Sequence, residues 1–313
     1  MTITQLQYVL AVAEYKNFTL AAEKCFVTQP TLSMQIQKIE EELGIQIFDR
    51  TKKPIQLTDI GLKIVNQAKN IVNEADRIQD IVQHQKGFIG GDFRIGIIPT
   101  IMPTLLPMFL NNFIKKYPKV NLIIEELNTD EIITKLNNGH LDAAIAATPL
   151  NEDKIKEIVL YFEPFVAYIP ENNSIHNKKE IEVSDLNLDE ILLLQDGHCF
   201  RDGILNLCKN VNKSEKSNFQ IESGSFETLI KLADEGLGIT LLPFLHTLDL
   251  SEKNKTKLRH FKEPKPAREV SLIYPKTELK IHIIDALRST IAGVIKGAIV
   301  FQNVEIISPK PIK

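Results

Sequence analysis

Two cysteines in the C-terminal half of this 313-residue chain carry its clearest chemical signal. Cys199 stands in a Gly-His-Cys-Phe-Arg-Asp stretch, and Cys208 follows nine residues later. The glycine-containing turn predicts Cys199 at the start of a helix, where the partial positive charge of the helix end stabilises a thiolate. The neighbouring His198 and Arg201 could both donate to a developing anion. Because the thiolate is the reactive form, this pattern favours oxidation of Cys199 to a sulfenic acid.

Cys208 stands in a different setting. Ile204, Leu205 and Leu207 give its segment an apolar helical face, which predicts a buried and inert thiol. If the segment is helical, the two sulfurs lie about 13 Å apart along its axis, whereas a disulfide needs Cα atoms within about 7 Å. Joining them would therefore unwind the segment and act as a two-state switch. The alternative is that both cysteines are ordinary small hydrophobic residues.

The elements that must position these cysteines alternate between strand and helix patterns from residue 91 onward. The first strands are expected at 93–98, 120–127 and 142–147, with helices at 104–117 and 129–136 between them, and a last helix at about 279–296. This alternation predicts an α/β domain with a mostly parallel sheet.

The first 58 residues instead predict short helices. Leu32, Ile36, Ile39 and Leu43 form one buried helix face after the N-cap Thr28, and a shorter helix precedes it across a tight turn. Such a pair is a helix-turn-helix signature. The expected DNA-reading residues of the second helix are Gln29, Pro30, Thr31, Ser33, Gln35 and Lys38. A following hairpin carries Arg50, Lys52 and Lys53, which could neutralise phosphates. The alternative is a small helical packing module.

A long helix is expected from residue 60 to about residue 86, since this stretch contains no proline. Its apolar residues step by four and three, as in a heptad seam: Ile64, Ala68, Ile71, Ala75, Ile78 and Val82. The seam predicts a homodimer through this linker helix; the alternative is packing on its own domain. Gly87, Gly90 and Gly91 then indicate a hinge.

Composition excludes several classes of protein. With 37 Lys and Arg against 40 Asp and Glu, the net charge of −3 gives no general reason to expect nucleic acid as a partner. No apolar run is long enough for a membrane span, and no signal peptide is visible, so we expect a cytoplasmic protein with no membrane partner. Three cysteines are too few for a secreted disulfide scaffold. The histidines show no metal spacing, and we expect no metal, no cofactor and no enzyme.

The N-terminal 61 residues carry a dense set of motifs: Phe18-x-x-Ala21-Ala22, Thr28-Gln29-Pro30-Thr31-Leu32-Ser33, Gln35-Ile36-x-Lys38-x-Glu40, Leu43-Gly44, Phe48-x-Arg50 and Thr58-x-x-Gly61. This set resembles the LysR-type transcriptional regulators. The resemblance implies a winged helix-turn-helix domain (1–58) that binds double-stranded operator DNA, a dimerisation linker helix and hinge (59–90), and an α/β regulatory domain (91–301) resembling periplasmic binding proteins. It implies two lobes, lobe I at 91–163 plus 268–301 and lobe II at 164–267. A loose tail is expected at 302–313.

The regulatory domain resembles the hydrogen-peroxide-sensing members of that family. The matching pieces are Gly197-His198-Cys199-x-Arg201-Asp202 with Cys208, Ile98-Pro99-Thr100, Leu105-Leu106-Pro107, Thr129 and Gly236-x-Gly238-Ile239-x-Leu241-Leu242-Pro243. The resemblance implies that Cys199 is the peroxidatic cysteine and that Cys208 resolves it as a disulfide. It implies a peroxide pocket formed by Thr100, Thr129 and His198, with Arg201 and Arg268 as supporting charges.

The same resemblance implies a homotetramer, an activator that works with RNA polymerase on antioxidant genes, and a thiol reductant system that resets it. The chain departs from the pattern at Phe200, which is bulkier than expected, and at Thr104, where a tyrosine is expected. Three alternatives stay open: a LysR-type regulator of a small anionic or aromatic metabolite bound between the lobes, a thiol peroxidase, and a transport solute-binding protein, which would need a signal peptide.

Overall fold

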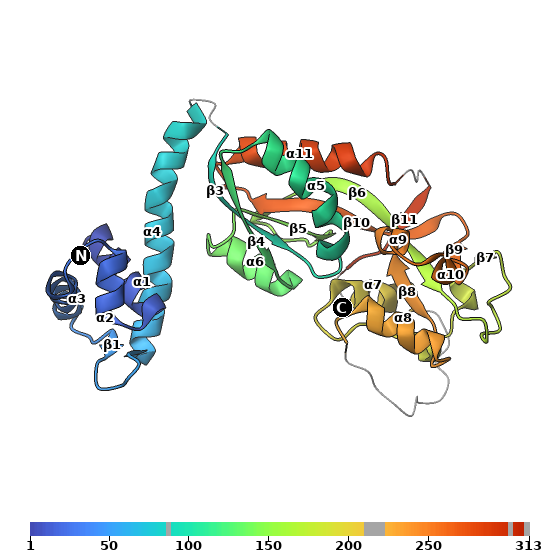
Figure 1. Ribbon diagram of the computed structural model, residues 1–313, viewed down its shortest axis with the longest axis horizontal. Helices are drawn as coiled ribbons and strands as arrows, with labels where there is room; N and C mark the ends of the chain where they lie inside the picture. Colours follow the sequence, from blue (N-terminus) through green and yellow to red (C-terminus); the bar gives the residue numbers. More distant parts are fainter. Residues whose placement is uncertain (86–88, 210–222, 300–302, 310–313) are drawn as a thin grey trace. The chain divides into compact units, whose positions relative to one another are not determined.

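The computed structural model describes residues 1–85, 89–209, 223–299 and 303–309 (Figure 1). The chain divides into two compact units, residues 1–87 and 88–313. Each unit is described by itself.

The first unit is a helical domain with a small hairpin. Its elements are α1 (Ile3–Tyr15), α2 (Phe18–Lys24), α3 (Gln29–Leu43), β1 (Phe48–Asp49), β2 (Gln56–Leu57) and α4 (Asp59–Gln85). Thr28 is the N-cap of α3, as predicted, and Gly44, with a φ of 66°, ends the helix. Leu32, Ile36 and Ile39 are fully buried in the core of this unit.

The hairpin between α3 and α4 is anchored by a buried carboxylate. Glu40 accepts hydrogen bonds from the backbone N–H groups of Ile47 (2.8 Å) and Phe48 (3.2 Å) through one oxygen. Its other oxygen accepts from Arg50 at 2.8 Å. The hairpin strands pair in the register Phe48↔Leu57. The last turn of α3 therefore holds the wing of a winged helix-turn-helix domain.

Helix α4 begins at Asp59, one residue before the predicted start, and the Thr58 hydroxyl caps its first turn by accepting from the Gly61 N–H at 2.9 Å. Along the expected seam, Ala68 is buried and Ile71 packs against the core of its own unit, which agrees with the alternative of intradomain packing for this half. Ile78 is 64% exposed. The side chain of Val82, and the structure of Gly87, lie outside the described residues. Dimerisation through α4 stays a prediction.

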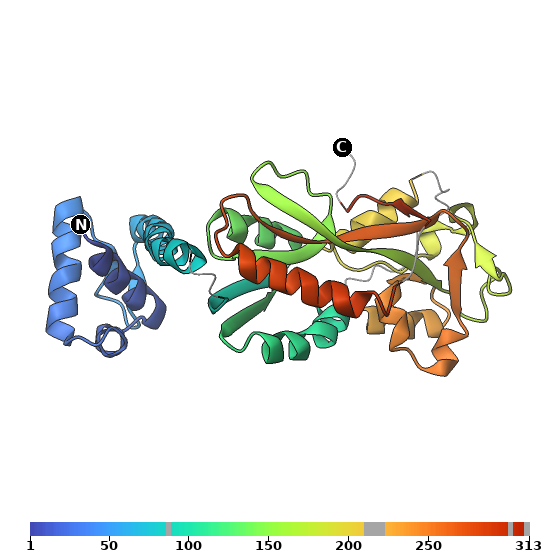
Figure 2. The same ribbon diagram turned by 90° about the horizontal axis from the view of Figure 1, so that it is seen from above.

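The second unit is built on a sheet in the order β4-β3-β5-β10-β6-β9-β7, with β11 beside β10 and β8 beside β6. These strands are labelled in Figure 1, and Figure 2 shows the same unit from above, with helix α11 in red. Its strands are β3 (Gly91–Ile97), β4 (Val120–Glu126), β5 (Ala143–Thr148), β6 (Ile155–Tyr168), β7 (Glu180–Ile181), β8 (Thr240–Pro243), β9 (Leu258–Phe261), β10 (Lys265–Pro275) and β11 (Val304–Ile306). Its helices are α5 (Met102–Lys116), α6 (Thr129–Asn137), α7 (Cys199–Leu207), α8 (Phe226–Asp234), α9 (Phe244–Leu248), α10 (Glu252–Lys255) and α11 (Ile281–Ile295), with 3-10 turns at Val183–Asp185 and Leu188–Glu190.

The expectation of a mostly parallel sheet is wrong. β3 is parallel to β4 and β5, but the long strands β6 and β10 run antiparallel to each other and β10 runs antiparallel to β5. Two hydrophobic cores flank these long strands. The first gathers β3, β5, α5 and α11, and the second gathers the end of β6 with α7, α8 and β8. We call them lobe I and lobe II. β6 and β10 both run from one lobe to the other, in opposite directions.

The expectation of a loose tail is wrong for residues 303–309. Strand β11 pairs in parallel with β10, in the register Lys265↔Val304. The Ile307 N–H then donates to the Ala267 carbonyl at 2.8 Å, and Pro309 is buried. Residues 302 and 310–313 lie outside the described part of the chain.

Candidate functional site

Helix α7 holds the two cysteines at its opposite ends. His198 is its N-cap residue, Cys199 its first residue and Cys208 its C-cap. Both thiols are free and buried. Cys199 packs into the core of lobe I, although the predicted bounds place it in lobe II, whereas Phe200 and Cys208 pack into the core of lobe II. The helix expected from the sequence is therefore present, and it begins at the junction of the lobes.

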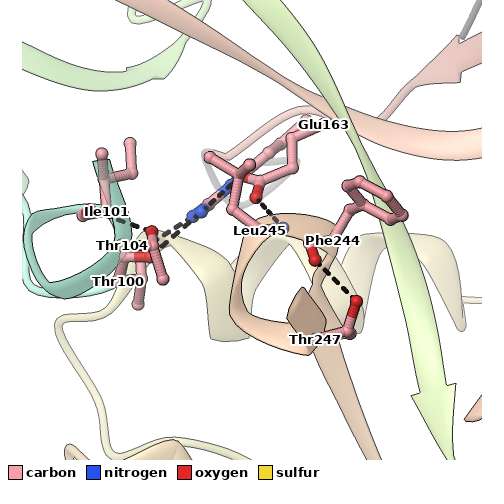
Figure 3. Close-up of polar contacts among 8 residues, drawn as sticks. Thr100, Ile101, Thr104, Glu163, Phe244, Leu245 and Thr247 are labelled. Atoms are coloured by element: carbon pink, nitrogen blue, oxygen red, sulfur yellow. Dashed lines mark hydrogen bonds and ion pairs between the residues drawn. The ribbon is translucent and has the colours of Figure 1, made fainter. Parts of the chain in front are cut away.

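A buried ion pair crosses the same junction. Arg268, on β10, is 3% exposed, and Glu163, its partner in register on β6, is fully buried. The Arg268 Nε and Nη2 groups donate to one Glu163 oxygen at 2.9 and 2.7 Å. The other oxygen accepts from the Leu245 N–H at 2.8 Å, at the start of α9 (Figure 3). Arg268 also donates to the hydroxyl of Thr100 at 2.8 Å and to its carbonyl at 3.1 Å. These contacts fix the cation where lobe I, lobe II and the crossing strands meet.

Burial and charge act in opposite directions on the Cys199 thiol. Burial raises the pKa of Cys199, while the positive charge of Arg268 and the nearby Thr129 hydroxyl lower this pKa and the Asp202 carboxylate raises it. Desolvation is the largest effect, so the thiol is mostly protonated at neutral pH. Apart from Cys199, the buried Thr129 hydroxyl oxygen has no hydrogen-bond partner among the described residues. A polar ligand beside Cys199 could therefore bind to it.

His198 and Arg201, the basic residues nearest to Cys199 in sequence, are not among the groups that shift its pKa. Arg201 pairs with Asp196 at 2.8 Å and donates to the Leu194 carbonyl at 3.0 Å, so it braces the loop before α7. Burial lowers the pKa of His198, which makes its imidazole neutral at pH 7. The cation that acts on the thiol is Arg268, sixty-nine positions away in the chain.

The bulky Phe200 fills an aromatic cluster. Its ring meets Phe165 edge-on at 5.0 Å and Phe226 at 5.2 Å between centroids. The Arg268 guanidinium lies over the same ring at 5.2 Å. Thr104 is smaller than the expected tyrosine, and its hydroxyl donates to the Ile101 carbonyl at the start of its own helix (Figure 3). Both departures from the family pattern are thus accommodated by local packing.

A second buried hydroxyl lies on the face of β6 that carries Glu163. The Tyr161 oxygen finds no hydrogen-bond partner among the described residues. Burial raises the pKa of Tyr161 far above its ordinary value, and the Glu163 charge adds to this effect. The phenol is therefore neutral at any physiological pH.

We expect Tyr161→Phe to leave the free energy of unfolding unchanged or to raise it by about 1 kcal/mol, because an unpaired buried hydroxyl costs free energy. Urea unfolding of the two proteins measures the difference. A loss above about 1 kcal/mol would show that the hydroxyl is hydrogen-bonded in solution.

The proposed DNA-reading residues lie along the first ten residues of α3. Gln29, Pro30, Thr31 and Lys38 are exposed, and Ser33 and Gln35 are partly buried. Two of them are engaged within the domain: Gln35 accepts from the Gln5 amide at 3.0 Å, and the hydroxyls of Thr31 and Thr28 lie 2.8 Å apart. In the wing, Lys52 and Lys53 are exposed, while Arg50 binds Glu40 and lies over the Phe18 ring. Arg50 therefore anchors the wing.

Sequence reasoning missed several residues around these sites. Met34 on α3 is 60% exposed and Phe26, at the turn before α3, is 96% exposed with a φ of 55°. Met34 stands four residues after Pro30, so helical spacing places the two on one face of α3 and could have identified Met34. The Glu163 partner of Arg268 could not have been found, since its role depends on strand register. In the described part of the chain, no cluster of metal-ligating side chains and no helix able to span a membrane is found.

The chain is similar to known proteins over nearly its whole length. Residues 3–62 match the bacterial regulatory helix-turn-helix protein, lysR family, and residues 86–294 match the LysR substrate binding domain. The DNA-binding transcriptional dual regulator OxyR of Escherichia coli K12 is 32% identical over 297 residues, which cover 94% of this chain and 97% of that protein. A hydrogen peroxide-inducible genes activator of Pectobacterium carotovorum is 33% identical over 88% of this chain and 90% of its own.

Solved structures give the same relationship. A full-length OxyR of Pseudomonas aeruginosa, with one cysteine replaced by aspartate, matches with a TM-score of 0.72 and 34% identity, over 93% of this chain and 98% of its own. A cysteine-to-serine variant of Corynebacterium glutamicum OxyR with bound hydrogen peroxide matches with a TM-score of 0.65 and 27% identity, over 97% and 98% of the two chains.

Proposed function

The chain belongs to the LysR family of transcriptional regulators, as an OxyR-like member, and we propose that it activates transcription when hydrogen peroxide oxidises Cys199. One observation carries this proposal: the buried Cys199 lies beside the buried Thr129 hydroxyl and within the influence of the Arg268 charge. Thr100 and His198 complete the proposed peroxide pocket. Arg201 supports it indirectly, through the loop that precedes α7.

The first step oxidises the sulfur of Cys199. The thiolate attacks one oxygen of hydrogen peroxide, an S–O bond forms as the O–O bond breaks, and the departing hydroxide takes up a proton to become water. Peroxide is reduced and the cysteine becomes a sulfenic acid. A hydroxyl donor such as Thr129 stabilises the departing oxygen.

The second step joins the two ends of α7. The Cys208 thiolate attacks the sulfenic sulfur, an S–S bond forms and the S–O bond breaks, releasing the oxygen as water once protonated. Burial raises the pKa of Cys208 to about 11, so this thiol is inert until it is exposed. Since nine residues of helical rise separate the two cysteines by about 13 Å along the axis of α7, the helix must unwind first. A dithiol would reverse the reaction by exchange.

The oxidation rate of Cys199 is expected to rise about tenfold per pH unit between pH 6 and 8. The sign follows from burial, which raises the pKa of this cysteine and leaves only a small thiolate fraction at neutral pH. Stopped-flow loss of the free thiol at limiting peroxide measures the rate. A rate independent of pH over this range would mean that the thiol is already ionised.

Regulation of transcription requires the protein to bind DNA and to assemble into oligomers. We propose dimers through α4, tetramers through the regulatory domains, and activation of antioxidant genes together with RNA polymerase. Footprinting of the reduced and the peroxide-treated protein on an operator selected from random double-stranded DNA tests this. We expect a specific footprint whose length or spacing changes with oxidation. A footprint indifferent to peroxide would favour regulation by a metabolite, and no footprint at all would contradict the DNA-binding function.

A further inference from the structure

The C-terminal segment 303–309 is attached to the strand that carries Arg268. Strand β11 pairs with Lys265–Ala267 of β10, directly before Arg268 (Figure 1). Hydrogen bonds flank this pairing at both ends: the Lys265 N–H donates to the Asn303 carbonyl at 3.2 Å, and the Ile307 N–H donates to the Ala267 carbonyl. The segment therefore has a fixed place at the crossing between the lobes.

The same segment holds helix α7. The Asn206 side-chain amide, in the last turn of α7, donates to the Ser308 carbonyl at 2.9 Å. Ile307 packs against the lobe II core that includes Phe200 and Cys208. Asn206 therefore connects the end of α7 that carries Cys208 to the residues that follow β11.

We propose that segment 303–309 is a strap that keeps α7 helical and slows the closure of the disulfide. The inference rests on the proposed function, because only disulfide formation requires α7 to unwind. Unwinding carries Asn206 away from Ser308, so the strap must release α7 before Cys208 can reach the oxidised sulfur. Cys199 lies at the far end of α7, in the core of lobe I. The strap therefore controls the second step and leaves the first unchanged, and Asn206 is a positioning residue.

The Asn206→Ala variant of the full chain separates the two steps. Loss of one hydrogen bond should speed disulfide formation about fivefold, measured by quenching after a peroxide pulse and peptide mass mapping. The rate of sulfenic acid formation, measured in a Cys208→Ser background with a trapping reagent, should not change. Asn111→Ala, at an exposed asparagine of α5 in lobe I, is the matched control and should change neither rate. An unchanged disulfide rate, or an equal change in both steps, would overturn the strap.

Hydrogen exchange of the wild-type protein gives a second readout. The amides of residues 304–307 should exchange faster after oxidation, and should not do so in the Cys208→Ser protein. A disulfide that forms without faster exchange would overturn the strap and leave the proposed function intact. If peroxide gives no disulfide at all, the proposed function fails and the strap fails with it.

Discussion

The Glu163→Ala variant is expected to lose about 3–5 kcal/mol of folding free energy. The substitution leaves the Arg268 guanidinium buried without its counter-charge and removes the acceptor of the Leu245 N–H. Burying an unpaired charge is among the most costly changes in a protein interior. Glu163 and Arg268 lie on β6 and β10, the strands that connect the two lobes. We therefore expect the loss of stability in the unfolding of the whole regulatory unit. Chemical denaturation followed by circular dichroism measures it.

Two further variants make this prediction specific. Glu163→Gln keeps an acceptor for the Leu245 N–H and should lose less than the alanine variant. Glu182→Ala removes the carboxylate of an exposed pair with Lys262, both about half exposed, and should cause no measurable loss. If Glu163→Ala were as stable as Glu182→Ala, the buried pair would not organise the junction of the lobes.

The Cys199→Ser variant is expected to lose the peroxide response entirely while keeping its DNA binding. A serine hydroxyl cannot form a sulfenic acid, so neither oxidation step can begin. The readout is peroxide-induced transcription from the selected operator, in vitro. Cys25→Ser is the matched control, because Cys25 lies at the end of α2 in the other unit, and its response should be unchanged.

Cys208→Ser separates oxidation from switching. This variant should accumulate the Cys199 sulfenic acid and activate transcription weakly or not at all, since α7 has no reason to unwind. Full activation by Cys208→Ser would mean that the sulfenic acid alone changes the protein. Full peroxide-induced transcription with the Cys199→Ser variant would refute the proposal that Cys199 senses peroxide.

The sequence predicted the elements that depend on local pattern. The cap of α3 at Thr28, the start of α4 at Thr58 and the cysteine-bearing helix α7 all follow from neighbouring residues. The electrostatics of Cys199 did not follow from its neighbours, because His198 and Arg201 adjoin it in sequence but Arg268, which only the family resemblance named, acts on it in space. The burial of Cys199, which raises its pKa, depends on packing against residues distant in sequence and leaves no local signal.

Strand β11 is a second feature that local sequence pattern does not predict. Val304 and Ile306 alternate with polar residues, but this pattern is too short to predict a strand by itself. It becomes a strand because β10 offers an unpaired edge at Lys265–Ala267. Edge pairing is a property of the folded sheet, and so the attachment of Ser308 to α7 could be seen only in three dimensions.

The most direct test of the account is peptide mass mapping of the reduced wild-type protein after a brief, near-stoichiometric pulse of hydrogen peroxide, with free thiols trapped on quenching. The account predicts a disulfide between Cys199 and Cys208 and a free Cys25. Unmodified thiols at positions 199 and 208 would contradict it.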